Sequence, residues 1–347
     1  MLFAVTVLSL FGILMVYDSS VAIAIRDFGN QYYYLRDQIK WLGVGFAALI
    51  GFSLVEYRRW YKIALPMLFV TLLLLLAVFL PGIGISALGA HRWINFGFFV
   101  LQPAELAKLV LIIYLAAWFS RPERERLLAF ALLVAMVVGL VLLEPDLGTS
   151  IILIAIALML YFCAGAPVIH FAFILPMLIV GVLGLAIISP YRAARLTTFL
   201  HPEIDPQGAS YHIHQALLGL GSGGWFGVGV GQSRQKYEYL PEANTDSIFA
   251  IIGEETGFVG SIAVLLMFVF ASWRGFRIAK RASDGFGRLL AIGITVWFSV
   301  QTIINLSAMV ALMPLTGVPL PFISYGGSSL IIMLAGVGIL LNISKTA

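Results

Sequence analysis

Long apolar runs with almost no charged residues recur along the whole chain, and no other feature restricts its fold as much. A helix needs about 20 apolar residues to cross the hydrocarbon core of a bilayer. These runs are too long and too continuous for the strands of a membrane barrel. We therefore expect ten membrane-spanning helices, near residues 2–22, 39–55, 63–81, 104–120, 127–143, 148–164, 169–188, 247–273, 289–312 and 326–343.

The composition supports this interpretation. Hydrophobic residues make up 61% of the chain and charged residues 11%, whereas soluble domains are about 25% charged. Lipid must then solvate much of the surface. We expect an all-α, polytopic membrane protein, formed by a single domain over residues 1–347, with one long extracytoplasmic loop at about 189–246. Cys163 is the only cysteine, so an internal disulfide is excluded.

Basic residues predict the orientation. Twelve of the 21 Lys and Arg residues fall in three short loops and the carboxyl-terminal tail: Arg58, Arg59, Lys62, Arg121, Arg124, Arg126, Arg274, Arg277, Lys280, Arg281, Arg288 and Lys345. Short segments rich in Lys and Arg stay in the cytoplasm, so both termini are expected there. The net charge of +4 suits contact with anionic lipids and gives no reason to expect a nucleic-acid partner.

Polar chemistry gathers in the segments on the opposite, outer face. The longest, at about 189–246, contains acids, aromatics and a glycine-rich stretch. Part of 208–222 has the pattern of an amphipathic helix that ends in glycine and lies along the membrane interface. Two further outer segments cover 81–103 and 313–328. No nucleotide-binding, zinc-binding or serine-triad motif occurs in the sequence.

Four ordered motifs resemble one family. They are QPAELAK at 102–108, EPDLGT at 144–149, GSGGWFGVGVGQSRQKYEYLPEANTDSIFAIIGEETGFVG at 221–260 and GVPLPFISYGGSS at 317–329. This chain resembles the SEDS family of bacterial cell-wall glycosyltransferases (FtsW, RodA and SpoVE). Its sequence at 221–240 is closer to the FtsW and SpoVE branch than to the RodA branch.

The resemblance implies a ten-helix, multi-pass protein of the bacterial cytoplasmic (inner) membrane that polymerises lipid II into glycan strands at the outer face. It also implies a class B penicillin-binding protein, a single-pass transpeptidase, as partner, beside other divisome or elongasome proteins. The chemistry suits the outer segments. A sugar hydroxyl attacks an anomeric carbon and expels a polyprenyl pyrophosphate, so the site needs a base and positive charge.

Asp246 is the candidate base. It closes the polar stretch from Glu242 and precedes an apolar run that begins at Ser247. The structural alternative is a helix N-cap, a position that Asp favours. Asn244, Thr245 and Ser247 are also good caps, so capping does not require an Asp here. In the family, the Asp of this pattern is regarded as catalytic. Glu242 is a nearby carboxylate that is either solvated or able to bind a metal or orient the substrate.

Glu105 and Lys108 form a second candidate site. Gln102, Pro103 and Glu105 suit the N-cap, first and third positions of a helix that enters the membrane from outside. Lys108 lies about one turn deeper, near the positive end of the helix dipole, and needs an anion. That anion is either Glu105 on the same face or a substrate pyrophosphate.

Other candidates complete the predicted substrate site. Arg92 suits a phosphate and Trp93 a sugar, with an interfacial belt aromatic as the alternative for Trp93. Ser324, Gly326 and Gly327 suit a backbone anion site at a helix start, or else close helix packing. Many family members have a basic residue where this chain has Val100. A divalent cation, Mg²⁺ or Mn²⁺, is the alternative source of positive charge, and no metal ligands are assigned.

Three interpretations stay open at this stage. Glu144 and Asp146 either hold a cation or cap the helix that begins near Leu147, and capping is slightly favoured. One of Glu254 and Glu255, inside the eighth span, is expected to face a buried polar partner. The rival functions are a flippase for lipid-linked precursors and a non-catalytic division scaffold. We favour the polymerase because the polar groups gather on one face, whereas a transporter places them near the midplane.

Overall fold

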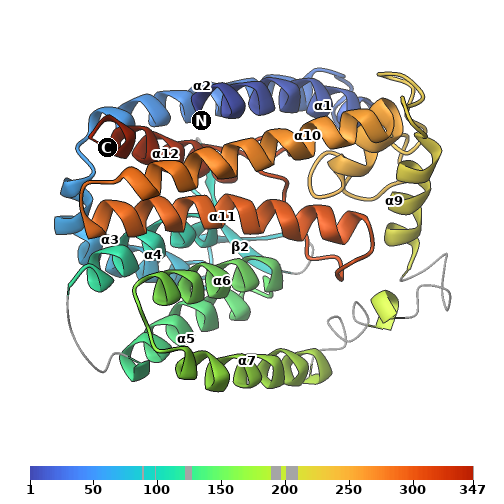
Figure 1. Cartoon of the computed structure of the whole chain (residues 1–347). Helices are drawn as coiled ribbons and strands as arrows, with labels where there is room; N and C mark the ends of the chain where they lie inside the picture. The colour runs from blue at the N-terminus through green and yellow to red at the C-terminus, as the bar shows by residue number, and fades with distance from the viewer. Residues whose placement is uncertain (88–89, 98, 122–126, 189–196, 201–209, 347) are drawn as a thin grey trace.

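The computed structural model describes residues 1–87, 90–97, 99–121, 127–188, 197–200 and 210–346. Within them, ten helices have 17 residues or more (Figure 1). They are α1 (Leu2–Phe28), α2 (Tyr33–Leu54), α3 (Arg58–Ala77), α4 (Pro103–Phe119), α5 (Leu127–Leu143), α6 (Leu147–Cys163), α7 (Val168–Ile188), α10 (Ile248–Arg281), α11 (Gly285–Met309) and α12 (Gly327–Lys345).

Each of these helices overlaps one predicted span, which confirms the helical, multi-pass fold. By length and composition alone, α1, α3, α10, α11 and α12 can cross a membrane, and α5, α6 and the first half of α7 are shorter apolar helices. The expected outer loop at about 189–246 is described in part, because residues 189–196 and 201–209 lie outside the described residues.

Helix α4 occupies the centre of the bundle. Nearly all of its side chains are buried, from Pro103 to Phe119. It packs against α3, α6 and α11, and α2 lies along α12. In Figure 1, α1 and α2 form the upper edge, α10, α11 and α12 cross the middle, and α5 and α7 form the lower edge. The core is mainly apolar, with Trp297 and Phe298 of α11 fully buried, and it also contains a few buried polar side chains.

A small antiparallel sheet precedes α4. Its strands β1 (Gly84–Ala87), β2 (Ala90–Asn95) and β3 (Val100–Leu101) are arranged in that order. Ile94 on β2 pairs with Leu101 on β3. Residues 81–103 were expected to form an outer segment, and the strands within it were not predicted. The sheet matters because it holds Arg92 and Trp93 beside the start of α4.

The predicted amphipathic helix is confirmed as α9 (Tyr211–Ser222), which is followed by Gly223 at its C-cap. Figure 1 shows α9 running across the right-hand ends of α10 and α11, at a large angle to both. A helix that crosses the ends of a membrane bundle lies in the position expected of an interfacial helix.

The glycine-rich stretch after α9, residues 223–231, packs against a break in α10, and we call this stretch the wedge. Gly257 has non-helical backbone angles, φ 66° and ψ −163°. The amides of Val228 and Gly229 donate to the carbonyls of Glu254 and Glu255, at 3.0 and 3.1 Å. The amide of Phe258 donates to the carbonyl of Gly224 at 2.8 Å. These bonds satisfy backbone groups that the break removes from the helix ladder, as a membrane interior requires.

The two ends of the bundle differ in chemistry. At one, the basic end, Arg58 pairs with Asp284 at 3.0 Å, and Lys345 donates to the Ser53 carbonyl at 3.0 Å. The other, the motif end, joins residues 90–103, 144–149, 233–248 and 316–328. Helices α4, α10 and α12 each run from the motif end to the basic end. The carboxyl terminus lies at the left of Figure 1, on the basic side.

Candidate active site

Asp246 lies at the motif end, just before α10, and is 8% exposed. Helix α10 begins at Ile248 with Ser247 as N-cap, and the Ser247 side chain makes no capping hydrogen bond. Asp246 therefore stands one residue before the N-cap position of this helix. The hydroxyls of Thr245 and Ser247 lie 3.5 Å from Oδ1 of Asp246. The carboxylate is thus held beside two hydroxyls.

The backbone around Asp246 is braced by α11. The side-chain amide of Asn305 donates to the carbonyls of Asp246 at 2.6 Å and Val318 at 2.8 Å. A Cβ added to Gly317 would lie 3.9 Å from Oδ2 of Asp246, so Gly317 lies directly beside the carboxylate. One buried amide thereby fastens the loop with Asp246 to the segment before α12.

A second set of contacts joins the same two motifs. The Ser324 hydroxyl donates to the Thr245 carbonyl and accepts from the amide of Leu320. The amide of Tyr325 donates to the Asn244 carbonyl at 2.9 Å. Ser324 is 5% exposed. In this structure Ser324 therefore braces the backbone of the candidate loop.

The two glycines predicted for an anion site differ. Gly326 is the N-cap of α12, and the nearest side-chain atom to a Cβ there is 3.8 Å away. A Cβ on Gly327 would lie 2.9 Å from the Trp41 indole. Gly327 thus satisfies the close-packing alternative, whereas Gly326 leaves room at the head of the helix.

Glu242 forms the turn that leads to Asp246. Its carboxylate accepts from the Thr245 hydroxyl at 2.8 Å, and its carbonyl accepts from the amides of Thr245 and Ser247. The side chain is exposed. Glu242 therefore shapes the loop, and its carboxylate is also accessible at the surface of the protein.

The EPDLGT motif lies beside this loop. Asp146 is the N-cap of α6 and accepts from the amide of Thr149 at 2.9 Å, so the capping interpretation is confirmed. A Cβ on Gly148 would lie 2.8 Å from the Thr316 carbonyl, which packs the start of α6 against the segment before α12. The side chain of Gln102 donates to Asp146 at 3.4 Å and so joins the first two motifs.

Arg92 on β2 reaches the same turn. Its guanidinium donates to the carbonyls of Glu144 at 3.0 Å and Pro145 at 2.5 Å. Trp93 follows it on the strand and is partly buried. Arg92 is thus a partly exposed cation at the motif end that also holds the EPDLGT turn. Val100, on neighbouring β3, is 43% exposed.

Glu144 is a buried acid in this turn. Its side chain is 0% exposed, and within the described residues neither carboxylate oxygen has a hydrogen-bond partner. Burial, reinforced by the Asp146 charge and opposed by Arg92, raises the pKa of Glu144 to about 8. Glu144 is therefore mainly protonated at neutral pH, a feature that the sequence did not indicate.

The predicted Glu105–Lys108 pair forms, with Nζ of Lys108 at 2.7 Å from Oε1 of Glu105. Helix α4 begins as expected, with Gln102 as N-cap and Pro103 in its first turn. Lys108 is 1% exposed. It also donates to Oε1 of Gln301 at 3.0 Å, and Gln301 donates to the Pro319 carbonyl. The pair is a buried ionic group tied to the segment before α12.

Two amides of α11, Gln301 and Asn305, hold these groups in place and were not among the residues predicted for the site. Both are almost fully buried. Polar side chains inside an apolar span are rare and usually have a partner or a function, so their presence in a membrane helix was a usable signal.

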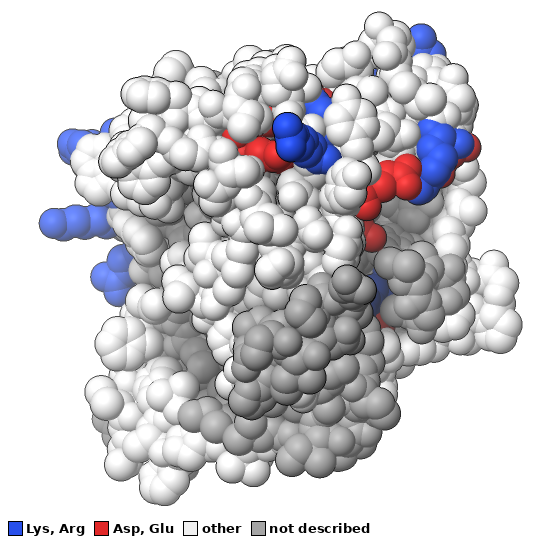
Figure 2. Space-filling view, turned by 90° about the vertical axis from the view of Figure 1, so that its right-hand side faces the viewer, with Lys and Arg blue, Asp and Glu red and all other residues white. Residues whose placement is uncertain are grey.

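Figure 2 views the end of the bundle at which α9 lies. Acidic and basic side chains lie next to one another in the upper half of this face. Among the described residues, no group of three or more His, Cys, Asp and Glu side chains is arranged to hold a metal ion. The motif end thus contains a nearly buried carboxylate at Asp246, a partly exposed cation at Arg92 and a buried acid with a raised pKa at Glu144.

Comparisons with known proteins agree with the fold and the motifs. The family model FTSW_RODA_SPOVE, described as "Cell cycle protein", matches residues 1–347. The chain is 43% identical to "Probable peptidoglycan glycosyltransferase FtsW" of Trichlorobacter lovleyi, over 99% of this chain and 92% of that protein. It is 39% identical to "Stage V sporulation protein E" of Bacillus subtilis, over 96% and 93% of the two chains.

Two solved structures are similar over almost the whole length. One, described as "Structural coordination of polymerization and crosslinking by a peptidoglycan synthase complex", contains a chain with a TM-score of 0.81 and 29% identity, covering 99% of this chain and 96% of that one. The rod shape determining protein RodA of Thermus thermophilus has a TM-score of 0.73 and 30% identity, with coverage of 99% and 95%.

Proposed function

Because this chain belongs to the FtsW, RodA and SpoVE family, we propose that it is a peptidoglycan glycosyltransferase that polymerises lipid II. In this proposal the reaction takes place at the outer face of the bacterial cytoplasmic membrane. The 4-hydroxyl of one sugar attacks the anomeric carbon of another, the bond from that carbon to the pyrophosphate breaks, and the configuration inverts. The hydroxyl proton passes to a carboxylate, and polyprenyl pyrophosphate leaves.

The observation that carries the proposal is the setting of Asp246. Asp246 is nearly buried, stands one residue before the N-cap position of α10, and has a backbone carbonyl that Asn305 holds. A general base must be held in place and partly shielded from water, and it then contributes about 10²–10⁴-fold to the rate. We assign Asp246 as this base, with Glu242 at the mouth of the same turn.

The leaving group needs positive charge in a partly desolvated site. Arg92 is a partly exposed cation at the motif end, and in this proposal it takes the role of the basic residue that many family members have at the position of Val100. Lys108 is the second candidate, although its buried partners mean that it must rearrange to touch a phosphate. Mg²⁺ or Mn²⁺ is a further candidate, because such ions bind through one or two carboxylates and complete their shell with substrate phosphates. Asp246 and Glu242 would supply the protein ligands.

The remaining substrate-site residues take supporting roles. Trp93 offers an aromatic face for a sugar ring, and Gln102 lies between the QPAELAK and EPDLGT motifs. Ser324 and Gly327 shape the head of α12, and Gly326 leaves an accessible backbone there. The proposed unit is one membrane domain over residues 1–347, with its extracytoplasmic segment at about 189–246.

The assembly follows from the family. A similar chain comes from a peptidoglycan synthase complex, and we propose a class B penicillin-binding protein as the partner of this chain, together with other divisome or elongasome proteins. The basic residues at one end favour an orientation with that end and both termini in the cytoplasm. The motif end then faces outward, where lipid II is polymerised and membrane lipids surround the bundle.

One experiment separates the polymerase from the rival functions. Purified protein is incubated with lipid II, with and without its partner, and the products are separated by size. We expect glycan strands that depend on this protein. Movement of labelled lipid II across liposomes without any polymer would favour the flippase, and neither activity with the partner present would favour the scaffold.

A further inference from the structure

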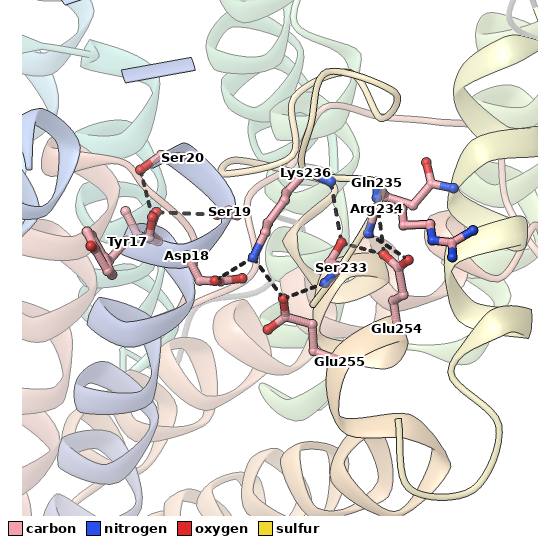
Figure 3. Close-up of polar contacts among 11 residues, drawn as sticks. Tyr17, Asp18, Ser19, Ser20, Ser233, Arg234, Gln235, Lys236, Glu254 and Glu255 are labelled. Carbon is pink, nitrogen blue, oxygen red and sulfur yellow. Dashed lines mark hydrogen bonds and ion pairs between the residues drawn. The ribbon is translucent and has the colours of Figure 1, made fainter. Parts of the chain in front are cut away.

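A second charged cluster lies behind the candidate loop, where α1, α10 and residues 233–236 meet (Figure 3). Nζ of Lys236 lies 2.8 Å from Oδ1 of Asp18 on α1 and 3.3 Å from Oε1 of Glu255 on α10. Lys236 is 5% exposed and Glu255 1%. Removing one partner of a buried ion pair is strongly destabilising, whereas removing one partner of a surface pair costs little.

The neighbouring acid, Glu254, accepts hydrogen bonds from the backbone of residues 233–236. Glu254 accepts from the Ser233 hydroxyl, from the Arg234 amide at 3.0 Å and from the Gln235 amide at 3.3 Å. Glu255 also accepts from the Ser233 amide at 3.1 Å. Both acids of α10 therefore face buried polar partners, where the sequence predicted one. Figure 3 shows Lys236 extending toward Asp18, with Arg234 and Gln235 pointing away.

The acids of this cluster divide into two sets. Asp18 and Glu255 face the ammonium of Lys236, whereas Glu254 is held by the Ser233 hydroxyl and by backbone amides. Within the described residues, Oδ2 of Asp18 and Oε2 of Glu255 are buried and have no hydrogen-bond partner. Removing the lysine would leave carboxylates without compensation in a desolvated place, which is strongly unfavourable. The cluster thus depends on Lys236, and Lys236 belongs to the loop.

A short backbone path leads from this turn to Asp246. The carbonyl of Gln235 accepts from the amide of Leu240 at 3.0 Å, and that of Glu242 accepts from the amide of Ser247 at 3.2 Å. Leu240 is 1% exposed. The loop is therefore fixed at both ends, by Lys236 on one side and by Asn305 and the segment before α12 on the other.

We infer that Lys236 is a positioning residue, which clamps the loop of Asp246 to α1 and α10 through Asp18 and Glu255. The inference rests on the proposed function, because it assigns the clamp a purpose in that reaction. Displacement of a catalytic group by about 1 Å can lower a rate by about 100-fold. Through Asp18, helix α1 thereby helps to set where the base stands.

The test removes the clamp without leaving an unpaired charge. The triple variant Asp18→Asn, Lys236→Met, Glu255→Gln is compared with wild type in lipid nanodiscs. We expect kcat for lipid II polymerisation to fall by about 10- to 100-fold, with little change in KM, as for a lost transition-state alignment. Backbone amides of 233–247 should exchange with deuterium about tenfold faster or more, because the loop opens locally.

Arg26→Gln is the matched control. Arg26 also joins α1 to this loop, by a 2.6 Å ion pair with Glu238, but its side chain is 56% exposed. Its removal should change kcat and amide exchange by less than about twofold. If the triple variant does not fold, Asp18→Asn takes its place, because Lys236 then still has Glu255. It should show the same two changes to a smaller degree.

Deuterium exchange reports on the clamp independently of activity. A wild-type protein that makes no glycan would overturn the proposed polymerase, while the exchange data would still test the clamp. Wild-type kcat in the folded triple variant, or in Asp18→Asn where that is the variant tested, would overturn the positioning role even if exchange were faster. Unchanged exchange would overturn it as well, whatever happened to kcat.

Discussion

At the scale of single residues, local pattern located the charged groups and left their partners unknown. Asp246, Glu105 and Lys108 lie in motifs or at spacings that sequence can identify, and the Glu105–Lys108 pair forms as expected. The amides Asn305 and Gln301 were recognisable as polar residues in an apolar span, but the groups that they contact could not be predicted, because long-range contacts have no sequence spacing. Arg92 binds backbone carbonyls, which every residue has, so no pattern could indicate that contact.

The Lys108 ion pair gives the first residue-scale prediction. Lys108→Met alone strands a buried Glu105 carboxylate and should destabilise the protein by about 3–5 kcal/mol. The double variant Glu105→Gln, Lys108→Met leaves no unpaired charge and should recover most of the melting temperature. The proposed substrate role requires that this folded double variant has lost most polymerisation. Wild-type polymerisation would assign the pair to the scaffold.

Glu144 gives a prediction on pH. Its pKa is raised from 4.5 to about 8 in the folded state, so between these values the folded protein binds a proton that the unfolded chain has lost. Stability should therefore fall as pH rises from about 5 to about 8. Melting temperatures in detergent should show this decline, and Glu144→Gln should flatten it. An equal decline in the variant would show that another group is responsible.

At the scale of elements, the long helices were predictable because an apolar run of 20 residues has few stable solutions in lipid other than a helix. The three-stranded sheet was not predictable. Its strands are short, and Ile94 pairs with Leu101 across an intervening connection that has no hairpin motif. The break in α10 was also missed. One glycine inside a helical pattern is common, and only its contact with the 223–231 wedge shows why Gly257 departs from helical geometry.

The wedge itself can be tested at Gly227. This residue has φ +81°, and a Cβ there would meet the Glu255 carbonyl at 2.0 Å. Gly29 is a matched control, because it has φ +65° with nothing within 4 Å of its Cβ position. Gly29→Ala should cost about 1 kcal/mol from backbone strain alone. Gly227→Ala should lower the melting temperature distinctly more, and equal shifts for the two variants would refute the tight wedge.

At the scale of the whole molecule, the basic end and the motif end lie at opposite ends of the bundle. The orientation of the bundle in the membrane therefore decides on which side the candidate site lies. In a Cys163→Ala background, a cysteine at Val230 should react with a membrane-impermeant thiol reagent in intact cells. A cysteine at Lys280 should react only after the cells are permeabilised. Both side chains are exposed, so burial does not interfere. The reverse labelling pattern would place the candidate site in the cytoplasm and exclude polymerisation outside.

The proposed reaction depends on Asp246, and polymerisation by purified Asp246→Asn protein is its most direct test. Asn keeps nearly the same size and leaves the backbone carbonyl that Asn305 holds, so the fold and the melting temperature should stay close to wild type. A base cannot be replaced by an amide. We predict that wild-type protein with its partner converts lipid II to glycan strands and that the folded variant makes none. Near-normal strands from the variant would contradict it.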